Sequence, residues 1–118
     1  MTELSAEDAK IVTLARGARL RAHAPHTGVA EGAAVRDTDG RTYAAATVEN
    51  ADASLTTSAL RAAVAAAASS GVRTFEAAAL VADGAVRAAD LAVLREFGLG
   101  VPVLLAGPDG AVRETLRT

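Results

Sequence analysis

The sequence predicts one α/β domain in which helices cover both faces of a mixed sheet of about five strands, a three-layer α/β/α arrangement. Two nearly continuous apolar segments, 75–82 and 101–106, are typical of strands that are buried on both faces. Segments with helical spacing of apolar residues alternate with these strands. The chain has 118 residues, 51% of them hydrophobic, and shows no internal repeat or linker, so we expect residues 1–118 to form a single domain.

The first predicted helix begins after Ser5, because the segment Ser5–Asp8 resembles a capping box with acidic residues in its first turn. Pro25 is expected to end the helix, since proline has no amide hydrogen to donate. Leu20 falls on the opposite side and is the exception to the pattern. The other apolar residues recur at helical spacing, at Ile11, Leu14, Ala15, Ala18 and Ala22.

A β-hairpin and a second helix are expected next. Segments 32–36 and 41–47 are compatible with strands, and the turn sequence Asp-Thr-Asp-Gly at 37–40 separates them. Thr56 or Thr57 can cap the second helix, and Gly71 is expected to stop it. The apolar positions of this helix are Leu60, Ala63, Val64 and Ala67.

The C-terminal part alternates strand, helix and strand. The buried strand 75–82 is followed by a third predicted helix over about 88–97, which ends at Gly98. The buried strand 101–106 and a turn at 107–110 come next. The last segment, 111–116, fits either a short edge strand or a helix, and the sequence leaves both open.

Composition excludes several classes of function. The formal net charge of −2, from 12 basic and 14 acidic residues, and the 3% of aromatic residues disfavour a nucleic-acid partner. The chain has no apolar run near the roughly 20 residues that span a bilayer, and its acidic N-terminus is unlike a secretory signal, so we expect a cytoplasmic protein without a membrane partner. The absence of cysteine excludes disulfides, thiolate nucleophiles and cysteine-ligated metal sites.

Several short segments occur in an order that is typical of one protein family. His-Ala-Pro-His-Thr at 23–27 follows the first helix, and Gly-Ala-Ala at 32–34 begins the first strand. Asp-Gly-Arg at 39–41 with Tyr43, Val-Glu-Asn-Ala at 48–51 with Leu55 and Thr56, and Leu94, Glu96 and Phe97 follow. Over roughly residues 14–105 this set resembles the small homotetrameric cytidine deaminases, whose corresponding runs read Tyr-Ala-Pro-Tyr-Ser and Val-Gly-Ala-Ala. The resemblance implies a cytidine-deaminase-like fold, a homo-oligomer (a dimer or tetramer) and a small nucleoside as ligand.

The resemblance also identifies the positions that carry the chemistry in that family. Its zinc ion is held by a Cys or His in a C-x-E motif and by two Cys in P-C-x-x-C, each at a helix start, and the Glu moves protons. The matching ligand positions here are Ser58, Arg87 and Asp90, and the proton-shuttle position is Leu60. Arginine has no lone pair to give and leucine cannot move a proton, so the resemblance implies a degenerate member with neither zinc nor catalytic residues.

By the same resemblance, only some of the family's substrate-binding residues are present in this sequence. The residue that packs on the base, a Phe in the family, corresponds to Val29. The ribose-binding Asn and Glu correspond to Thr47 and Glu49, and Glu49 alone is retained. Together with His26 in the 23–27 loop, these residues are the nucleoside-binding candidates.

The same residues could also form two other kinds of site, a metal site or a hydrolytic triad. His23 and His26 could hold a metal ion with Asp90 or Glu49, or else replace the family's aromatic residues at the pocket mouth or in a subunit contact. Ser58 could form a hydrolytic triad with a histidine, or else cap or line the second helix.

The residues at the positions of the family's zinc ligands can pack in two ways. Arg87 and Asp90 form either a solvent-facing i, i+3 pair or, with Arg61, a salt-bridged cluster that closes the former zinc cavity while Leu60 fills the catalytic hollow. The sequence favours a catalytically inactive cytidine-deaminase-like protein that serves as an oligomeric scaffold, a regulator or a weak nucleoside binder. The alternative is a nucleoside (cytidine) deaminase, or another nucleoside-handling hydrolase, with a non-standard site.

Overall fold

The computed structural model describes residues 4–118. In chain order its helices and strands are α1 (Ala6–Arg19), β1 (Gly32–Asp37), β2 (Thr42–Ala46), the 3₁₀ turn η1 (Ala53–Leu55), α2 (Ala59–Ser69), β3 (Phe75–Val81), α3 (Ala88–Arg95), β4 (Pro102–Ala106) and β5 (Val112–Arg117).

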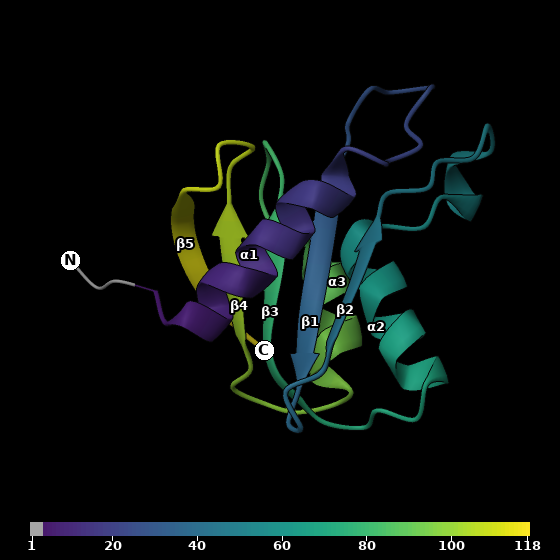
Figure 1. Ribbon diagram of the computed structural model, residues 1–118. Helices are drawn as coiled ribbons and strands as arrows, with labels where there is room; N and C mark the ends of the chain where they lie inside the picture. Colours follow the sequence, from purple (N-terminus) through teal and green to yellow (C-terminus); the bar gives the residue numbers. More distant parts are fainter. Residues whose placement is uncertain (1–3) are drawn as a thin grey trace.

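The strands form one sheet in the order β2–β1–β3–β4–β5. β3 and β4 are parallel, whereas every other neighbouring pair is antiparallel, so the sheet is mixed. Helix α1 crosses one face of this sheet, and α2 and α3 lie on the other (Figure 1). The predicted three-layer arrangement with about five strands is confirmed. The last segment, which the sequence left open, is the edge strand β5.

Two predicted helix boundaries are wrong, each for a local reason. Regular helix α1 ends at Arg19, well before Pro25, because the amides of residues 20–22 bond carbonyls three residues back instead of four. Helix α2 is capped by Ser58, which the sequence also offered, and not by Thr56 or Thr57; the Oγ of Ser58 accepts from the amide of Arg61 at 3.3 Å. Thr57 is extended and exchanges two backbone hydrogen bonds with Val48, so it is not available as a cap.

The α1 face is packed by small residues. Alanines of β1 and β3 meet Ile11, Ala15 and their helical neighbours without large side chains between them. Gly32 lies so close to the helix that a Cβ atom there would stand 2.0 Å from the carbonyl oxygen of Ala15. The helix and the sheet therefore approach almost backbone to backbone at this point.

The opposite face carries the larger core. Alternate residues of β3 point to the two faces, so this central strand is buried on both sides. Leu60 and Val64 from α2 and Leu94 from α3 are fully or almost fully buried against it. At the end of this core where β3 begins, the rings of Phe75 and Phe97 pack edge to face, with their centroids 5.5 Å apart. Among the helices of residues 4–118, none has both the length and the apolar character that crossing a membrane requires.

Candidate functional site

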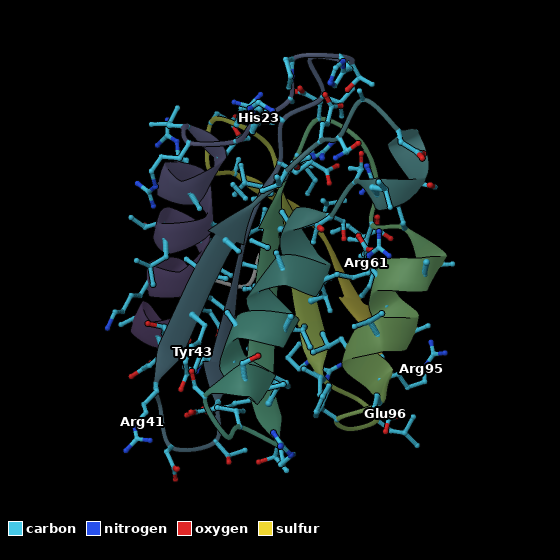
Figure 2. The ribbon with its side chains drawn as sticks, turned by 90° about the vertical axis from the view of Figure 1, so that its right-hand side faces the viewer. His23, Arg41, Tyr43, Arg61, Arg95 and Glu96 are labelled. Atoms are coloured by element: carbon cyan, nitrogen blue, oxygen red, sulfur yellow. The ribbon has the colours of Figure 1, made fainter. Side chains whose placement is uncertain are left out.

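A cleft of about 330 Å³ opens where the N-termini of α2 and α3 meet the loops that follow α1 and β2. The start of a helix leaves backbone amides without intrahelical partners, so such a junction favours polar side chains and ligands. Figure 2 shows Arg61 at this junction, with the polar atoms of neighbouring side chains around it. The cleft is lined by Thr27, Val29, Glu31, Thr47, Glu49, Ala53, Thr56, Ser58, Arg61 and Arg87.

Ser58, Arg61 and Asp90 form a tight polar cluster between the two helix starts. The hydroxyl of Ser58 donates to Asp90 Oδ1 at 2.9 Å, and Arg61 Nε donates to Ser58 Oγ at 3.0 Å. Arg61 Nε also lies 3.3 Å from Asp90 Oδ1, and the Asp90 side chain is only 1% exposed. The alternative of a triad of Ser58 with a histidine is therefore not formed, because the serine hydroxyl donates to Asp90, and the other alternative, that Ser58 caps the second helix, is confirmed.

Arg87 links this cluster to Glu31. Its Nη1 and Nη2 donate to Glu31 Oε1 and Oε2 at 2.8 and 3.4 Å, and Nη1 lies 3.5 Å from Asp90 Oδ2. The hydrogen bond to Glu31 raises the pKa of Arg87, although burial opposes the shift. The expectation of a salt-bridged cluster of Arg61, Arg87 and Asp90 is confirmed, and the solvent-facing pair is wrong because Asp90 is buried.

The sequence interpretation did not identify Glu31, although it is buried and lines the cleft. A signal was present: Glu31 directly precedes the Gly-Ala-Ala segment, where the matching family run has a valine. A carboxylate that replaces an apolar residue beside a fully buried strand needs a cation nearby. Arg87 is that cation, but the 56 positions between the two residues concealed the pairing.

Glu49 occupies the other end of the cleft. Its Oε1 accepts from the backbone amides of His26 at 2.9 Å and Thr27 at 3.2 Å, and its Oε2 accepts from the Thr27 hydroxyl. The hydrogen bond from the Thr27 side chain, helped by the two amides, lowers the pKa of Glu49. The 23–27 loop therefore holds an ionised carboxylate in a fixed position.

The remaining sequence-predicted residues lie in different environments. Val29 lines the cleft with a side chain exposed by about half, whereas Leu60 is fully buried in the core. Thr47 lines the cleft too, but its hydroxyl accepts from the amide of Glu31 at 3.1 Å and so helps to close the loop. His26 contributes its backbone amide, and its side chain is exposed like that of His23. Within residues 4–118, no three His, Cys, Asp or Glu side chains lie close enough together to hold a metal ion.

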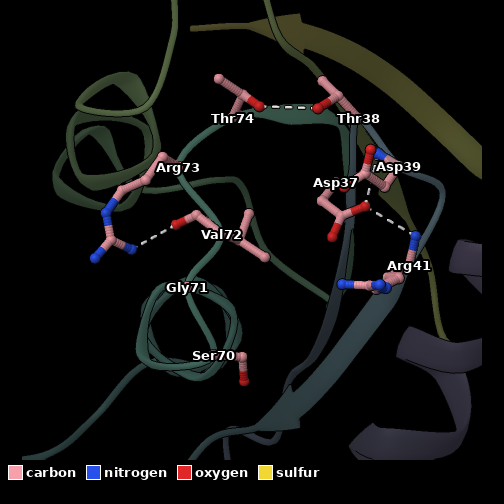
Figure 3. Close-up of a pocket in the computed structure, with 9 residues that line it drawn as sticks. All are labelled: Asp37, Thr38, Asp39, Arg41, Ser70, Gly71, Val72, Arg73 and Thr74. Atoms are coloured by element: carbon pink, nitrogen blue, oxygen red, sulfur yellow. Dashed lines mark hydrogen bonds between the residues drawn. The ribbon is translucent and has the colours of Figure 1, made fainter.

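A smaller hollow of about 160 Å³ lies at the opposite end of α2, between the β1–β2 turn and the segment after the helix (Figure 3). Asp37 Oδ1 accepts from the amides of Asp39 and Arg41, each at 2.9 Å, and the hydroxyls of Thr38 and Thr74 lie 2.9 Å apart. These polar groups hold the turn in place, so the cleft at the helix starts is the stronger candidate site.

Comparison with known proteins agrees with this placement of the elements. A family model described as "Cytidine deaminase-like" matches residues 4–110. A protein named cytidine deaminase from Sporosarcina psychrophila is 38% identical over 115 residues, which cover 90% of this chain and 82% of the relative.

Solved structures give the same result. Cytidine deaminase from Burkholderia pseudomallei superposes with a TM-score of 0.83 at 30% identity, covering 100% of this chain and 92% of that protein. Cytidine deaminase from Mycobacterium tuberculosis gives a TM-score of 0.74 at 30% identity over 85% and 84% of the two chains. The structure from Mycobacterium leprae, at 22% identity and a TM-score of 0.77 over 92% of this chain and 90% of that one, supports the fold alone.

Proposed function

Because the chain belongs to the cytidine deaminase-like family, we propose that it is a non-catalytic member that binds a pyrimidine nucleoside in the cleft without deaminating it. The observation that carries this proposal is the ion-pair cluster at the two helix starts. Ser58, Arg87 and Asp90, which match the family's zinc-ligand positions, bond one another and their neighbours. Ser58 and Asp90 join the starts of α2 and α3, and Arg87 joins the start of α3 to Glu31.

The donor atoms of these residues do not fit a zinc ion. Zinc in proteins is held by several converging lone pairs from nitrogen, sulfur or carboxylate oxygen. Here one donor is a neutral hydroxyl, and another position offers a guanidinium that has only hydrogens to give. The remaining carboxylate, Asp90, already faces Arg61 at 3.3 Å and Arg87 at 3.5 Å. A divalent cation beside them would meet positive charge rather than a ligand set.

Glu49 supports the binding half of the proposal. An ionised carboxylate has about four lone-pair sites, and three donors from the 23–27 loop occupy part of them. The carboxylate remains an acceptor for one further donor from within the cleft, such as a sugar hydroxyl. Val29 adds exposed apolar surface at the rim, against which a flat base can lie.

The same proposal includes a homo-oligomer. The segments that line the cleft carry the exposed apolar side chains of Val29, Val48 and Leu55. Apolar side chains gathered around a site mark a surface suited to a partner, and resemblance to a homotetrameric family points to a second copy of the chain. Sedimentation equilibrium tests this part, and a monomer at all concentrations contradicts it.

One set of measurements tests the binding and the inactivity together. We expect cytidine or uridine to raise the melting temperature, because a ligand that binds only the folded state stabilises it by mass action. The shift should vanish in Glu49→Ala and persist in Glu114→Ala, a variant of an exposed glutamate on β5 away from the cleft. Incubation with cytidine should release no ammonia, and metal analysis of untagged protein should find far less than one zinc per chain. Absence of any nucleoside shift in the wild type overturns the proposal.

A second candidate function is a nucleoside deaminase that works through a non-standard site. It is favoured by the name of the relative that is 38% identical to this chain over the matched residues. Ammonia release that persists in the presence of a chelator and is lost in Asp90→Asn supports this alternative over the first. Stoichiometric zinc together with ammonia release also supports this alternative, as a metal-dependent reaction.

A further inference from the structure

We propose that the arginine end of the cleft selects a neutral group that only accepts hydrogen bonds, so that the protein binds uridine, with a keto pyrimidine, in preference to cytidine. The inference rests on the proposed nucleoside binding and deepens it. It concerns Arg61 and Arg87, the two arginines that line the cleft.

Arg61 presents unused donors to the cleft. Its Nε is held by Ser58 Oγ and lies near Asp90 Oδ1, which fixes the plane of the guanidinium. Within residues 4–118 no acceptor bonds its Nη1 or Nη2, although a guanidinium carries five N–H donors in a rigid fork. The side chain is 44% exposed, so the free edge of the fork is accessible from the cleft.

Arg87 presents a similar edge. Both of its terminal nitrogens reach Glu31, and over the described chain, 4–118, its Nε has no acceptor. The Arg87 side chain is 51% exposed. A planar cation with spare donors at such a site favours a ligand oxygen that has lone pairs and no hydrogen.

The side-chain acceptors beside Arg61 and Arg87 are already occupied. Ser58 Oγ accepts from both the amide and the Nε of Arg61, and its own hydrogen goes to Asp90. The carboxylate of Glu31 is buried and bonds Arg87 with both oxygens. Asp90 Oδ2 has no hydrogen bond, but it is buried and does not line the cleft. The 4-amino group of cytosine would therefore lose water without finding a partner, and would face the hydrogens of two guanidiniums.

The charges around the cleft favour a neutral carbonyl over a phosphate as the ligand group. Arg61 and Arg87 carry two positive charges, and the neighbouring carboxylates of Glu31 and Asp90 carry two negative charges. The cluster as a whole is neutral, and Glu49 adds one further negative charge to the cleft. A doubly charged phosphate would add repulsion from these carboxylates, whereas a neutral carbonyl uses the spare donors without it.

Titration calorimetry with uridine, cytidine and uridine 5′-monophosphate tests the inference. We expect uridine to bind about tenfold more tightly than cytidine, a difference of about 1.4 kcal/mol. Arg61→Met should reduce this ratio to near one, while Arg95→Met, at an exposed arginine at the end of α3 (Figure 2), should leave it unchanged. Arg61→Lys keeps a charge for Asp90 but loses the planar fork, so it should also lose most of the preference.

The outcomes separate this inference from the function on which it rests. Equal binding of the two nucleosides, tighter binding of cytidine, or a preference that survives in both Arg61 variants overturns the inference and leaves nucleoside binding intact. Tighter binding of the monophosphate than of uridine shows an anion site and also overturns the neutral-acceptor assignment. If no nucleoside binds the wild-type protein, the proposed function fails and the inference fails with it.

Discussion

The two faces of the sheet use buried charge differently. On the α1 face, Arg36 of β1 is held between Asp8 of α1 at 3.0 Å and Glu76 of β3 at 3.1 Å, and its side chain is only 9% exposed. On the α2–α3 face, Arg87 is about half exposed and lines a cleft. The first arginine is enclosed by the elements that it joins, whereas the second has one side open to a ligand.

This difference follows from how closely the layers approach. Alanine and glycine bring α1 almost into backbone contact with β1, and the hollow of about 600 Å³ on this face lies beside the helix, next to β4 and β5. The starts of α2 and α3 are instead joined to each other through a cluster of polar side chains, with the apolar core beneath it. We therefore expect substitutions on the α1 face to change stability alone, and substitutions at the open end of the α2–α3 face to change the response to nucleosides.

The largest effect is expected from introducing a glutamate at position 60. Leu60 is fully buried, so the carboxylate of Leu60→Glu would be desolvated without a partner. We expect the free energy of unfolding at pH 7 to fall by about 4 kcal/mol, and the variant to release no ammonia from cytidine. Leu60→Met is the control for volume and should cost less than about 1.5 kcal/mol.

The pH dependence of that variant gives a second check. Burial raises the pKa of a carboxyl, so the folded variant binds its proton more readily than the unfolded chain does. The loss of stability relative to wild type should therefore shrink as the pH is lowered towards the ordinary pKa of glutamate. Chemical denaturation at several pH values measures this, and a loss that is equal at pH 5 and pH 8 contradicts the buried position.

The next effect in size tests the close packing of the α1 face. In Gly32→Ala the new Cβ would meet the backbone of Ala15 and Arg19, and a backbone cannot turn aside as a side chain can. We expect a loss of about 3 kcal/mol in the free energy of unfolding. Gly17→Ala, in the last turn of α1, where the added Cβ meets no neighbouring element within 4 Å, should instead stabilise by about 0.5 kcal/mol. Equal effects from the two substitutions would show that the helix and the sheet are not in contact.

A pair of arginine variants compares the two faces directly. Arg36→Met removes a buried cation from two partly exposed carboxylates, so we expect a loss of about 2 kcal/mol, with nucleoside binding unchanged. Arg61→Met takes one of two cations from Asp90, whose side chain is only 1% exposed, so its cost should also be about 2 kcal/mol, but here the nucleoside preference falls as well. Melting curves with and without uridine separate the two effects. A change in ligand response in Arg36→Met would remove the distinction between the faces.

Much of the fold could be predicted because its signals are local or periodic. The buried strands β3 and β4 follow from their apolar sequences, and the hairpin follows from its turn residues. The cap of α2 was misplaced because Thr56, Thr57 and Ser58 are all good capping residues. Which of them caps depends on the bridge between Thr57 and Val48, a contact that is not apparent from the local sequence.

The candidate site was predicted only where a family motif marks a position. Glu49 and Ser58 fall in matched segments, and the structure brings both to one cleft. Glu31 and Arg61 lie outside those motif positions, although Arg61 entered the packing hypothesis. The bond between Glu31 and Arg87 joins residues that flank two neighbouring strands, one before β1 and one after β3, and it has no periodic signature in the sequence. Sequence alone therefore identified several residues of the cluster, but not the full network of contacts that joins them.

The smallest expected effect concerns acid stability at the Glu49 end of the cleft. Hydrogen bonds from Thr27 and two amides lower the pKa of Glu49 in the folded protein below its usual 4.5. The unfolded chain thus binds the proton more readily, so the stabilisation by this carboxylate is fully present above about pH 4.5 and is lost as the pH falls through the lowered value. Glu49→Gln cannot titrate and should show a flatter decline of stability below pH 4.5 than the wild type. Glu114→Gln, on the exposed strand β5, serves as the control and should follow the wild-type curve. If the Glu49 and Glu114 variants lose stability along the same curve in acid, the loop does not hold the carboxylate in the way that its hydrogen bonds indicate.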